Sequence, residues 1–213
     1  MNAGLHDREA PSAGGVGSGA LDLAFVLSGA RLPGEYAEAL WSALLVQLPW
    51  LAEEPELGVN VVRASRSNGN LLLSRRTRLV LRVPRRRVAD AMRLTGCTLQ
   101  VEGELLVVGE ARVHPLEPFP TLSARFVETG AADELEHQQA VEAMLGRLGL
   151  PLRFICGRMC TVRHGGRAIG GAEVVLHGLR PEQSIAMLEH GLGPGRHLGS
   201  GLFLPHKTIS GID

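Results

Sequence analysis

Residues 21–48 read LDLAFVLSGARLPGEYAEALWSALLVQL, and this stretch decides the fold. Residues 21–28 form an apolar run of strand length, and Pro33-Gly34-Glu35 then opens a helix. The apolar residues that recur at helical spacing behind this opening are Ala37, Leu40, Trp41, Leu44, Leu45 and Leu48. The stretch therefore predicts a strand followed by an amphipathic helix.

The rest of the first half completes the order β-α-β-β-α-β. In chain order we expect a strand at residues 59–62, a hairpin turn at 67–70, a long strand at 71–83, a helix at 85–94, and an extended hairpin segment at 98–113 that turns at Glu102-Gly103. This order is the split βαβ arrangement of ferredoxin-like and RRM-type domains.

A proline-rich junction at residues 115–120 leads into a second half with the same order. Here we expect a strand at 122–127, a helix at 133–148, extended segments at 152–162 and 167–176 joined by a hairpin at 164–166, a helix at 181–190 ended by Gly191, and a closing strand at 202–205. We predict an α+β protein of two tandem ferredoxin-like (RRM-type, βαββαβ) domains, residues 20–118 and 119–213, after a flexible leader at 1–19.

Charge is unevenly distributed along the chain. The formal net charge is +0 at pH 7, yet residues 61–96 hold ten arginines and a single acid, Asp90. Lys207 is the only lysine, so nearly all positive charge comes from arginine. Guanidinium groups suit bidentate phosphate contacts, but a GC-rich genome would produce the same preference for arginine over lysine. The sequence shows no secretory signal and no apolar run of ~20 residues, so we expect a cytoplasmic protein without a membrane partner.

A glycine-punctuated segment, GLGPGRHLGSG at residues 191–201, precedes the closing strand. Its glycines allow positive φ and let backbone N–H groups approach a phosphate, which makes Gly193, Gly195 and Gly199 candidate RNA contacts. Arg196 and His197 lie inside it. A plain glycine-rich turn would show the same letters, so the pattern alone leaves both interpretations open.

Arginines supply the other candidate RNA contacts. Strand periodicity would place Arg76, Arg78 and Arg82 on one face of the strand at 71–83, opposite its apolar face. A solvated outer sheet face would look the same. Three further arginines at the next helix start oppose its dipole, which favours an anionic partner there. The complete set of predicted RNA-binding cations is Arg75, Arg76, Arg78, Arg82, Arg85, Arg86, Arg87, Arg158, Arg163, Arg196 and Lys207.

No cofactor or metal is expected. Cys156, Cys160 and His164 resemble zinc ligands, but a fourth ligand is missing and an extended segment would spread them apart. The pair of base-stacking aromatics on a central strand of a typical RRM is not evident either, so we do not expect base readout of that kind.

These motifs together resemble the CRISPR-associated endoribonuclease family that processes precursor CRISPR RNA. That family carries a Gly-hydrophobic-Gly, five-residue spacer, Gly-hydrophobic-Gly loop, matched here by Gly191, Gly193, Gly199 and Gly201, with Ser200 at one hydrophobic position. Further similar segments are LPWL at 48–51, RRTRLVLR at 75–82, HGL at 177–179 and GLFLPHK at 201–207, as in the subgroup serving type I interference complexes.

The resemblance implies metal-independent cleavage of repeat RNA, in which a 2′-hydroxyl attacks the adjacent phosphate and leaves a 2′,3′-cyclic phosphate. It also implies that the protein stays on the 3′ stem-loop, beside other subunits of a type I crRNA-guided complex. Such enzymes commonly place a histidine near the start of the first helix, where this chain has Tyr36. We expect Tyr36 to position the 2′-hydroxyl, and His197 first or His206 second to transfer the proton.

Two other interpretations stay open. The chain can be a subunit that holds the stem-loop without cutting it, since the first-helix histidine is absent. It can also be an unrelated RRM-like regulator with no preference for CRISPR repeats.

Overall fold

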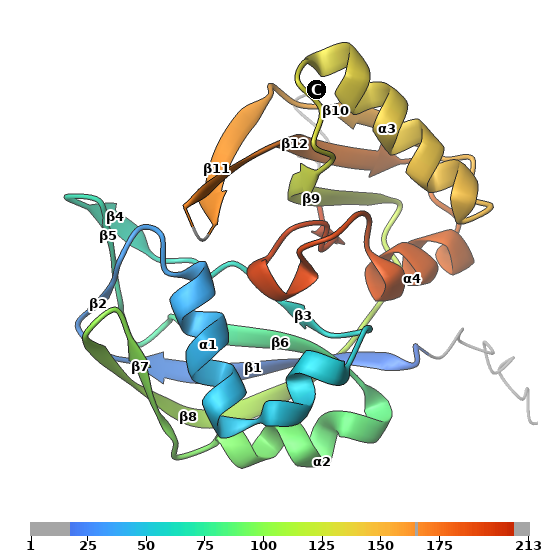
Figure 1. Ribbon diagram of the computed structural model, residues 1–213. Helices are drawn as coiled ribbons and strands as arrows, with labels where there is room; N and C mark the ends of the chain where they lie inside the picture. The colour runs from blue at the N-terminus through green and yellow to red at the C-terminus, as the bar shows by residue number, and fades with distance from the viewer. Residues whose placement is uncertain (1–17, 165, 207–213) are drawn as a thin grey trace, which may run out of the picture.

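The computed structural model describes residues 18–164 and 166–206, which form two α/β units joined by one linker (Figure 1). The N-terminal unit contains, in chain order, β1 (Ala20–Ser28), β2 (Arg31–Leu32), α1 (Ala37–Gln47), the 3-10 turn η1 (Pro49–Glu53), β3 (Gly58–Val59), β4 (Ser65–Ser67), β5 (Asn70–Leu72), β6 (Arg78–Pro84), a helical segment made of η2 (Arg85–Arg87), α2 (Val88–Ala91) and η3 (Met92–Leu94), β7 (Thr98–Val101) and β8 (Glu104–Pro115).

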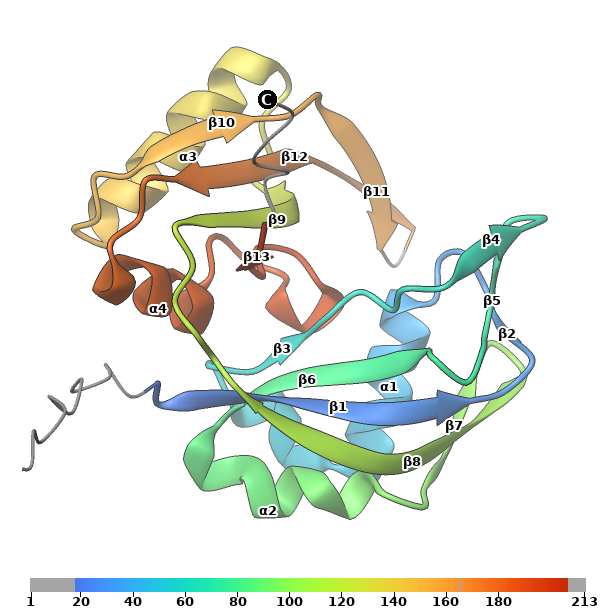
Figure 2. The same ribbon diagram turned by 180° about the vertical axis from the view of Figure 1, so that it is seen from behind.

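The main sheet of this unit has the strand order β3-β6-β1-β8-β7, with every neighbouring pair antiparallel. Along β1, Leu23, Phe25 and Leu27 are buried beneath α1, whereas Asp22 turns to the opposite face. Figures 1 and 2 show α1 and α2 on one face of the sheet, and neither of these two helices on the other face. A small sheet of β2, β5 and β4 extends from one end.

The C-terminal unit contains β9 (Thr121–Glu128), α3 (Glu134–Arg147), β10 (Arg153–Cys156), β11 (Cys160–His164), β12 (Arg167–His177), α4 (Pro181–His190), the 3-10 turn η4 (Arg196–Leu198) and β13 (Leu204–Pro205). Its sheet has the order β10-β12-β9-β13, and β11 also pairs with β12. Val141 of α3 and Leu188 of α4 share one buried cluster with Leu122 and Leu176, so both helices pack on the same face. The mixed α/β architecture with antiparallel sheets is confirmed.

Two expected strands are interrupted. Residues 73–77 leave the sheet because Ser74 and Thr77 close a turn, with the Ser74 amide donating to Thr77 Oγ1 at 2.9 Å and the Thr77 amide donating to Ser74 O at 2.9 Å. The prediction of one strand over 71–83 is therefore wrong, and Arg75 and Arg76 lie in this turn. In the second unit, residues 157–159 likewise separate β10 from β11.

A buried arginine ties the two units together. The Arg82 side chain of β6 is 1% exposed and forms a bidentate ion pair with Asp22, at 2.8 and 2.9 Å. Its Nη1 also donates to Leu188 O at 2.7 Å and to Phe203 O at 2.9 Å. The prediction that Arg82 lies on an open cationic face is wrong, because the end of α4 and the segment before β13 cover that part of the sheet.

Two further expectations concern the leader at the N-terminus and membrane-spanning segments. The leader predicted at residues 1–19 lies outside the described residues except for Ser18 and Gly19, which hydrogen bond to the Glu189 carboxylate. Within residues 18–164 and 166–206, no helix has the length and apolar character needed to cross a membrane.

Candidate active site

The glycine-punctuated segment folds into a loop closed by its own backbone, which we call the glycine loop (residues 191–201). The Leu192 amide donates to Gly201 O at 2.9 Å, and the Gly201 amide donates to Phe126 O of β9 at 2.8 Å. A Cβ atom at Gly201 would lie 1.9 Å from Leu192 O, and one at Gly191 would lie 2.5 Å from Gly201 O. Only glycine fits these contacts, so the outer glycines of the motif close the loop and do not line a phosphate cradle.

The inner residues of the loop face two cavities. Gly193, Gly195, Arg196 and His197 line a cavity on the helix side, whereas Gly199 and Ser200 line a second one towards β11. Figure 1 shows the loop between α1 and α4, at the seam between the two units. The glycine loop is therefore a partition between two cavities.

Tyr36 lines the second cavity, which we call the Tyr36 cavity and which has a volume of about 320 Å³. Arg66 enters from the β4–β5 hairpin and Arg163 from β11, while Glu35 supplies one carboxylate. Ser200 and Gly199 come from the glycine loop. Residues from both units thus meet around one phenol, with two guanidinium groups and one carboxylate in the lining.

The phenol of Tyr36 is fixed and protonated. Its oxygen accepts a hydrogen bond of 2.7 Å from the Val62 amide, and the side chain is buried at the start of α1. Burial raises the pKa of Tyr36 above its usual value of 10.0, against the lowering effects of the Val62 amide and of Arg66 and Arg125. The hydroxyl is therefore a hydrogen-bond donor at neutral pH and not a base.

A narrow neck connects the Tyr36 cavity to a groove between the two sheets. Val61 and Gly199 belong both to the Tyr36 cavity and to the neck, where Arg63 and Arg125 also lie. The groove, of about 440 Å³, is lined by residues of β1, β6, β8 and β13, which lie towards the viewer in Figure 2. Its polar and charged lining residues are Asp22, Asn60, Arg63, Arg76, Arg78 and His114.

The cavity on the helix side, which we call the Trp41 cavity, has a volume of about 490 Å³. The His197 ring lies against Trp41 of α1, with ring centroids 5.0 Å apart and planes inclined at 49°. Arg196 donates to His190 O and, at 3.2 Å, to Glu56 O. Burial lowers the pKa of Arg196 to about 10, helped by the charge of Arg82, so this guanidinium is still charged at neutral pH.

The structure does not bring the predicted catalytic residues together. His197 lines the Trp41 cavity and not the Tyr36 cavity. The His206 amide donates to Thr121 O at the start of β9. Thr121 is five residues before Phe126, the residue of β9 that lines the Tyr36 cavity. At ~3.3 Å per residue these two positions on β9 are about 16 Å apart.

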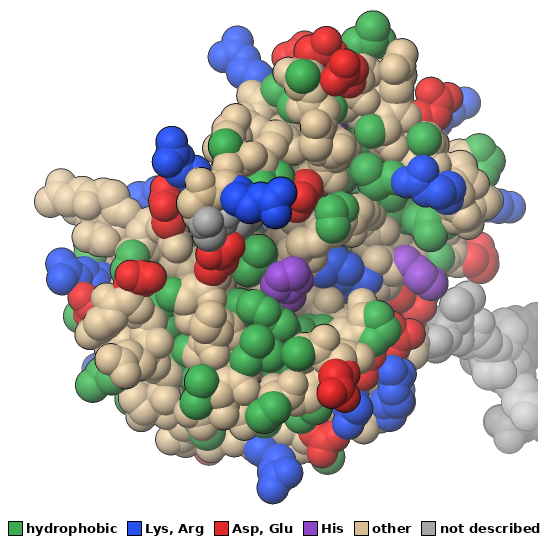
Figure 3. Space-filling model, viewed as in Figure 1, with side chains coloured by type: hydrophobic (Ala, Val, Ile, Leu, Met, Phe, Trp, Pro, Cys, Tyr) green, Lys and Arg blue, Asp and Glu red, His purple; other side chains and the backbone are tan. Residues whose placement is uncertain are grey.

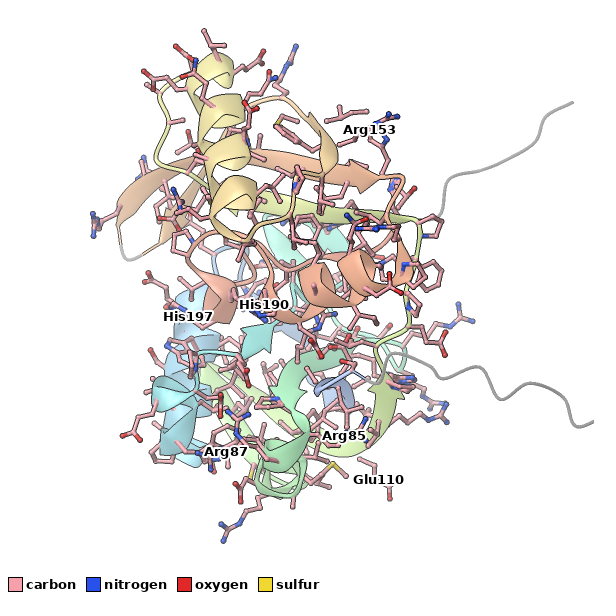
Figure 4. All side chains as sticks on the ribbon, turned by 90° about the vertical axis from the view of Figure 1, so that its right-hand side faces the viewer. Arg85, Arg87, Glu110, Arg153, His190 and His197 are labelled. Carbon is pink, nitrogen blue, oxygen red and sulfur yellow. The ribbon has the colours of Figure 1, made fainter. Side chains whose placement is uncertain are left out.

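Apart from the buried Arg82, the predicted RNA-binding arginines divide into three groups. Arg163, Arg76, Arg78 and Arg196 line cavities or the groove. Arg86 and Arg87 share Glu54, at 2.8 and 3.3 Å, and also pair with Glu56 and Asp90, at 2.9 and 3.1 Å, so their charges are already compensated within the protein. Arg75, Arg85 and Arg158 are exposed outside these cavities, and Lys207 lies outside the described residues. Figure 4 shows Arg85 and Arg87 on the N-terminal unit, away from His197 at the seam.

Sequence reasoning missed Arg66, Arg63, Arg125 and Trp41 as site residues. Arg66 carried one available signal, since it flanks the Asn68-Gly69 turn of the β4–β5 hairpin, where both residues have positive φ. The other three gave none, because their neighbours at the site come from distant parts of the chain. Among residues 18–164 and 166–206, no cluster of three or more His, Cys, Asp or Glu side chains is placed to hold a metal ion.

Comparison with known proteins places these features in a family. A family model described as "Cas6 Crispr" matches residues 21–208, which include both units and the glycine loop. The chain belongs to the Cas6 family. The CRISPR-associated endonuclease Cas6 of Myxococcus xanthus (strain DK1622) is 37% identical to it over 186 residues, covering 87% of this chain and 81% of the relative.

Solved structures share the fold at lower identity. A CRISPR associated protein Cas6 superposes with a TM-score of 0.60 at 10% identity, covering 88% of this chain and 100% of the other. A Cas6-related protein from Pyrococcus furiosus has a TM-score of 0.60 at 14% identity, over 88% and 98% of the two chains. A RAMP protein binding different RNA substrates has a TM-score of 0.53 at 13% identity, over 86% and 98%.

Proposed function

We propose that this chain binds the stem-loop of CRISPR repeat RNA and cleaves precursor CRISPR RNA at the Tyr36 cavity. The observation that carries the proposal is the lining of this cavity, where a protonated phenol meets Arg66, Arg163 and the glycine loop. The cavity continues through the neck at Arg63 into a groove lined by Arg76 and Arg78. The positive charge of this path suits an RNA backbone that crosses the seam.

We further propose that both units are ferredoxin-like domains, residues 20–118 and 119–213. The supporting observation is the strand order. Numbered by their place in a βαββαβ unit, the core strands β3-β6-β1-β8 run 2-3-1-4, and β10-β12-β9-β13 run in the same order. A split βαβ unit produces this order because the third strand inserts between the first two.

Cleavage would proceed by attack of a 2′-oxygen on the adjacent phosphorus. The new P–O bond forms as the bond to the 5′-oxygen breaks, which leaves a 2′,3′-cyclic phosphate and a 5′-hydroxyl. The Tyr36 hydroxyl, held by the Val62 amide, would donate a hydrogen bond and orient the reacting groups. Arg66 and Arg163 would stabilise the negative charge that develops on the phosphate oxygens, and the protons would exchange with solvent.

In this mechanism the positive charge at the phosphate comes from guanidinium groups, so we expect cleavage without a metal ion. We also propose that the protein stays on the 3′ stem-loop after cleavage, beside other subunits of a type I crRNA-guided complex. Arg63, Arg76 and Arg78 line the neck and the groove outside the Tyr36 cavity, so their contacts to RNA would survive cleavage.

The test uses the purified chain and the repeat RNA of a CRISPR array from the same genome, in the presence of EDTA. We expect one site-specific cut whose upstream product carries a 2′,3′-cyclic phosphate, measured by mass spectrometry. A cut that requires added Mg²⁺, or one that leaves a 3′-hydroxyl, would contradict the mechanism.

The second candidate function is a subunit that holds the stem-loop without cutting it. The observation that favours it is the position of His197 and His206, neither of which lines the Tyr36 cavity. In the same assay this candidate predicts RNA that is retarded on a native gel and remains intact.

A further inference from the structure

The Trp41 cavity is chemically different from the cationic path described above. Its apolar lining comes from Trp41, Leu51, Ala52, Pro55, Leu57 and Pro194. Figure 3 shows the corresponding face, on which apolar and histidine side chains gather along the seam between the two units. A cavity of about 490 Å³ with Trp41 and His197 in its wall has room for one flat ring system.

Charge excludes the phosphate backbone from this cavity. The exposed Glu53 is part of its lining, and its carboxylate would repel a phosphate at short range, whereas the Glu54 carboxylate is already paired with Arg86 and Arg87. Arg196 is the only arginine in the lining, and its Nη groups already donate to the carbonyl oxygens of His190 and Glu56. A phosphate backbone therefore fits the cationic side of the glycine loop better than this cavity.

Two features of the lining instead suit a nucleobase. Trp41 and His197 are both half-buried, and their inclined ring planes leave aromatic surface on the cavity wall. The exposed Glu53 carboxylate adds a hydrogen-bond acceptor to the same lining. Every base offers a π-face for stacking, and bases with an exocyclic amino group offer a donor for such an acceptor.

We propose that the Trp41 cavity binds one unpaired nucleobase of the RNA, stacked on Trp41 or His197, while the backbone of the same strand follows the Tyr36 side of the glycine loop. This inference rests on the proposed function, because it uses the same RNA. It assigns His197 to base binding and not to proton transfer. The carboxylate of Glu53 favours a base with an exocyclic amino group, because an amine donates to it.

Tryptophan fluorescence tests the proposal directly, since the chain has only Trp41 and Trp50. Trp50 does not line the cavity and lies under the Arg87 guanidinium at 4.8 Å, so Trp50→Phe leaves Trp41 as the reporter and keeps an aromatic ring there. In this variant we expect repeat RNA to quench the Trp41 emission. The experiment is repeated with RNAs that carry one abasic nucleotide at each unpaired position in turn.

At one position the abasic RNA should fail to quench Trp41 and should bind roughly 5- to 150-fold more weakly, the range for losing one stacked base. Adding His197→Ala should shrink that penalty and leave the penalties at other positions unchanged. As a second readout, 2-aminopurine at that position should lose emission when the unmodified chain binds.

The outcomes separate this proposal from the proposed function. RNA that shifts on a native gel without quenching Trp41, or that quenches it equally with every abasic substitution, overturns the base site alone. An RNA that neither binds nor is cut overturns both.

Discussion

At the scale of single residues, Tyr36 is placed to donate a hydrogen bond. Burial raises the pKa of Tyr36, so its phenol keeps its proton well above neutral pH. The ratio of cleavage rate constants between the unmodified chain and Tyr36→Phe should therefore stay constant from pH 6 to pH 9 in single-turnover assays. A ratio that changes with a midpoint near pH 6.5 would instead show that a histidine acts together with Tyr36.

His137 makes folding stability depend on pH. The side chain is 0% exposed, and its Nδ1 lies 2.8 Å from Thr129 Oγ1. Burial lowers the pKa of His137 below 6.5, so the unfolded chain binds the proton more readily than the folded one. Stability should be full above pH 6.5 and should decline as the pH falls from there. Between pH 7.5 and pH 5.5, the melting temperature of His137→Leu should fall by less than that of the unmodified chain. Equal falls in the two proteins would contradict this account.

At the scale of elements, the glycine loop needs its outer glycines for steric reasons. A Cβ at Gly201 would collide with Leu192 O, whereas Gly103, in the β7–β8 turn, also has positive φ but has no atom within 4 Å of such a Cβ. We expect Gly103→Ala to cost about 1 kcal/mol from backbone strain. In urea denaturation, Gly201→Ala should lower the free energy of unfolding by at least about 2 kcal/mol more than Gly103→Ala does, because its methyl group also has no room beside Leu192 O. Equal costs would show that the loop relaxes around the added methyl group.

Local signals in the sequence predicted most of the elements. Asp133 accepts the Glu136 amide at the start of α3, Pro181 begins α4, and Gly191 ends it at φ 66°, as their residue types indicate. The break at residues 73–77 was missed because the Ser74 and Thr77 hydroxyls compete with the sheet for backbone groups. The alternation of apolar residues along the strand does not predict such a turn.

The site was less predictable than the fold. Periodicity correctly separates Arg82 from the apolar face of β6, but it does not show that the end of α4 covers the other face at Arg82. The Tyr36 cavity likewise combines Arg66 with Arg163, which are far apart in the chain. Only the tertiary structure brings such residues together, so the sequence indicated the chemistry of the site better than its members.

At the scale of the whole molecule, Arg82 sets how the two units meet. Arg82→Met would leave Asp22 without its partner and would remove the donor to Leu188 O and Phe203 O, which flank the glycine loop. We expect a loss of about 3 kcal/mol or more in the free energy of unfolding. Arg78 lies four residues before Arg82 on the same strand. Arg78→Met removes only the hydrogen bonds to Arg75 O and Thr77 O, so it should lower the free energy of unfolding by less than about 1 kcal/mol.

Denaturation in urea of both variants measures this difference. Equal losses would mean that Arg82 contributes no more to stability than a half-exposed arginine does.

The central claim is that this chain cuts repeat RNA at the Tyr36 cavity. It is tested most directly by measuring, on one repeat RNA, the single-turnover cleavage rate and the dissociation constant of the unmodified chain and of Tyr36→Phe. Loss of one hydrogen bond made in the transition state should lower the rate about 10- to 1,000-fold, while the dissociation constant changes less than about threefold. An unchanged rate, or equal losses in rate and affinity, would contradict the claim.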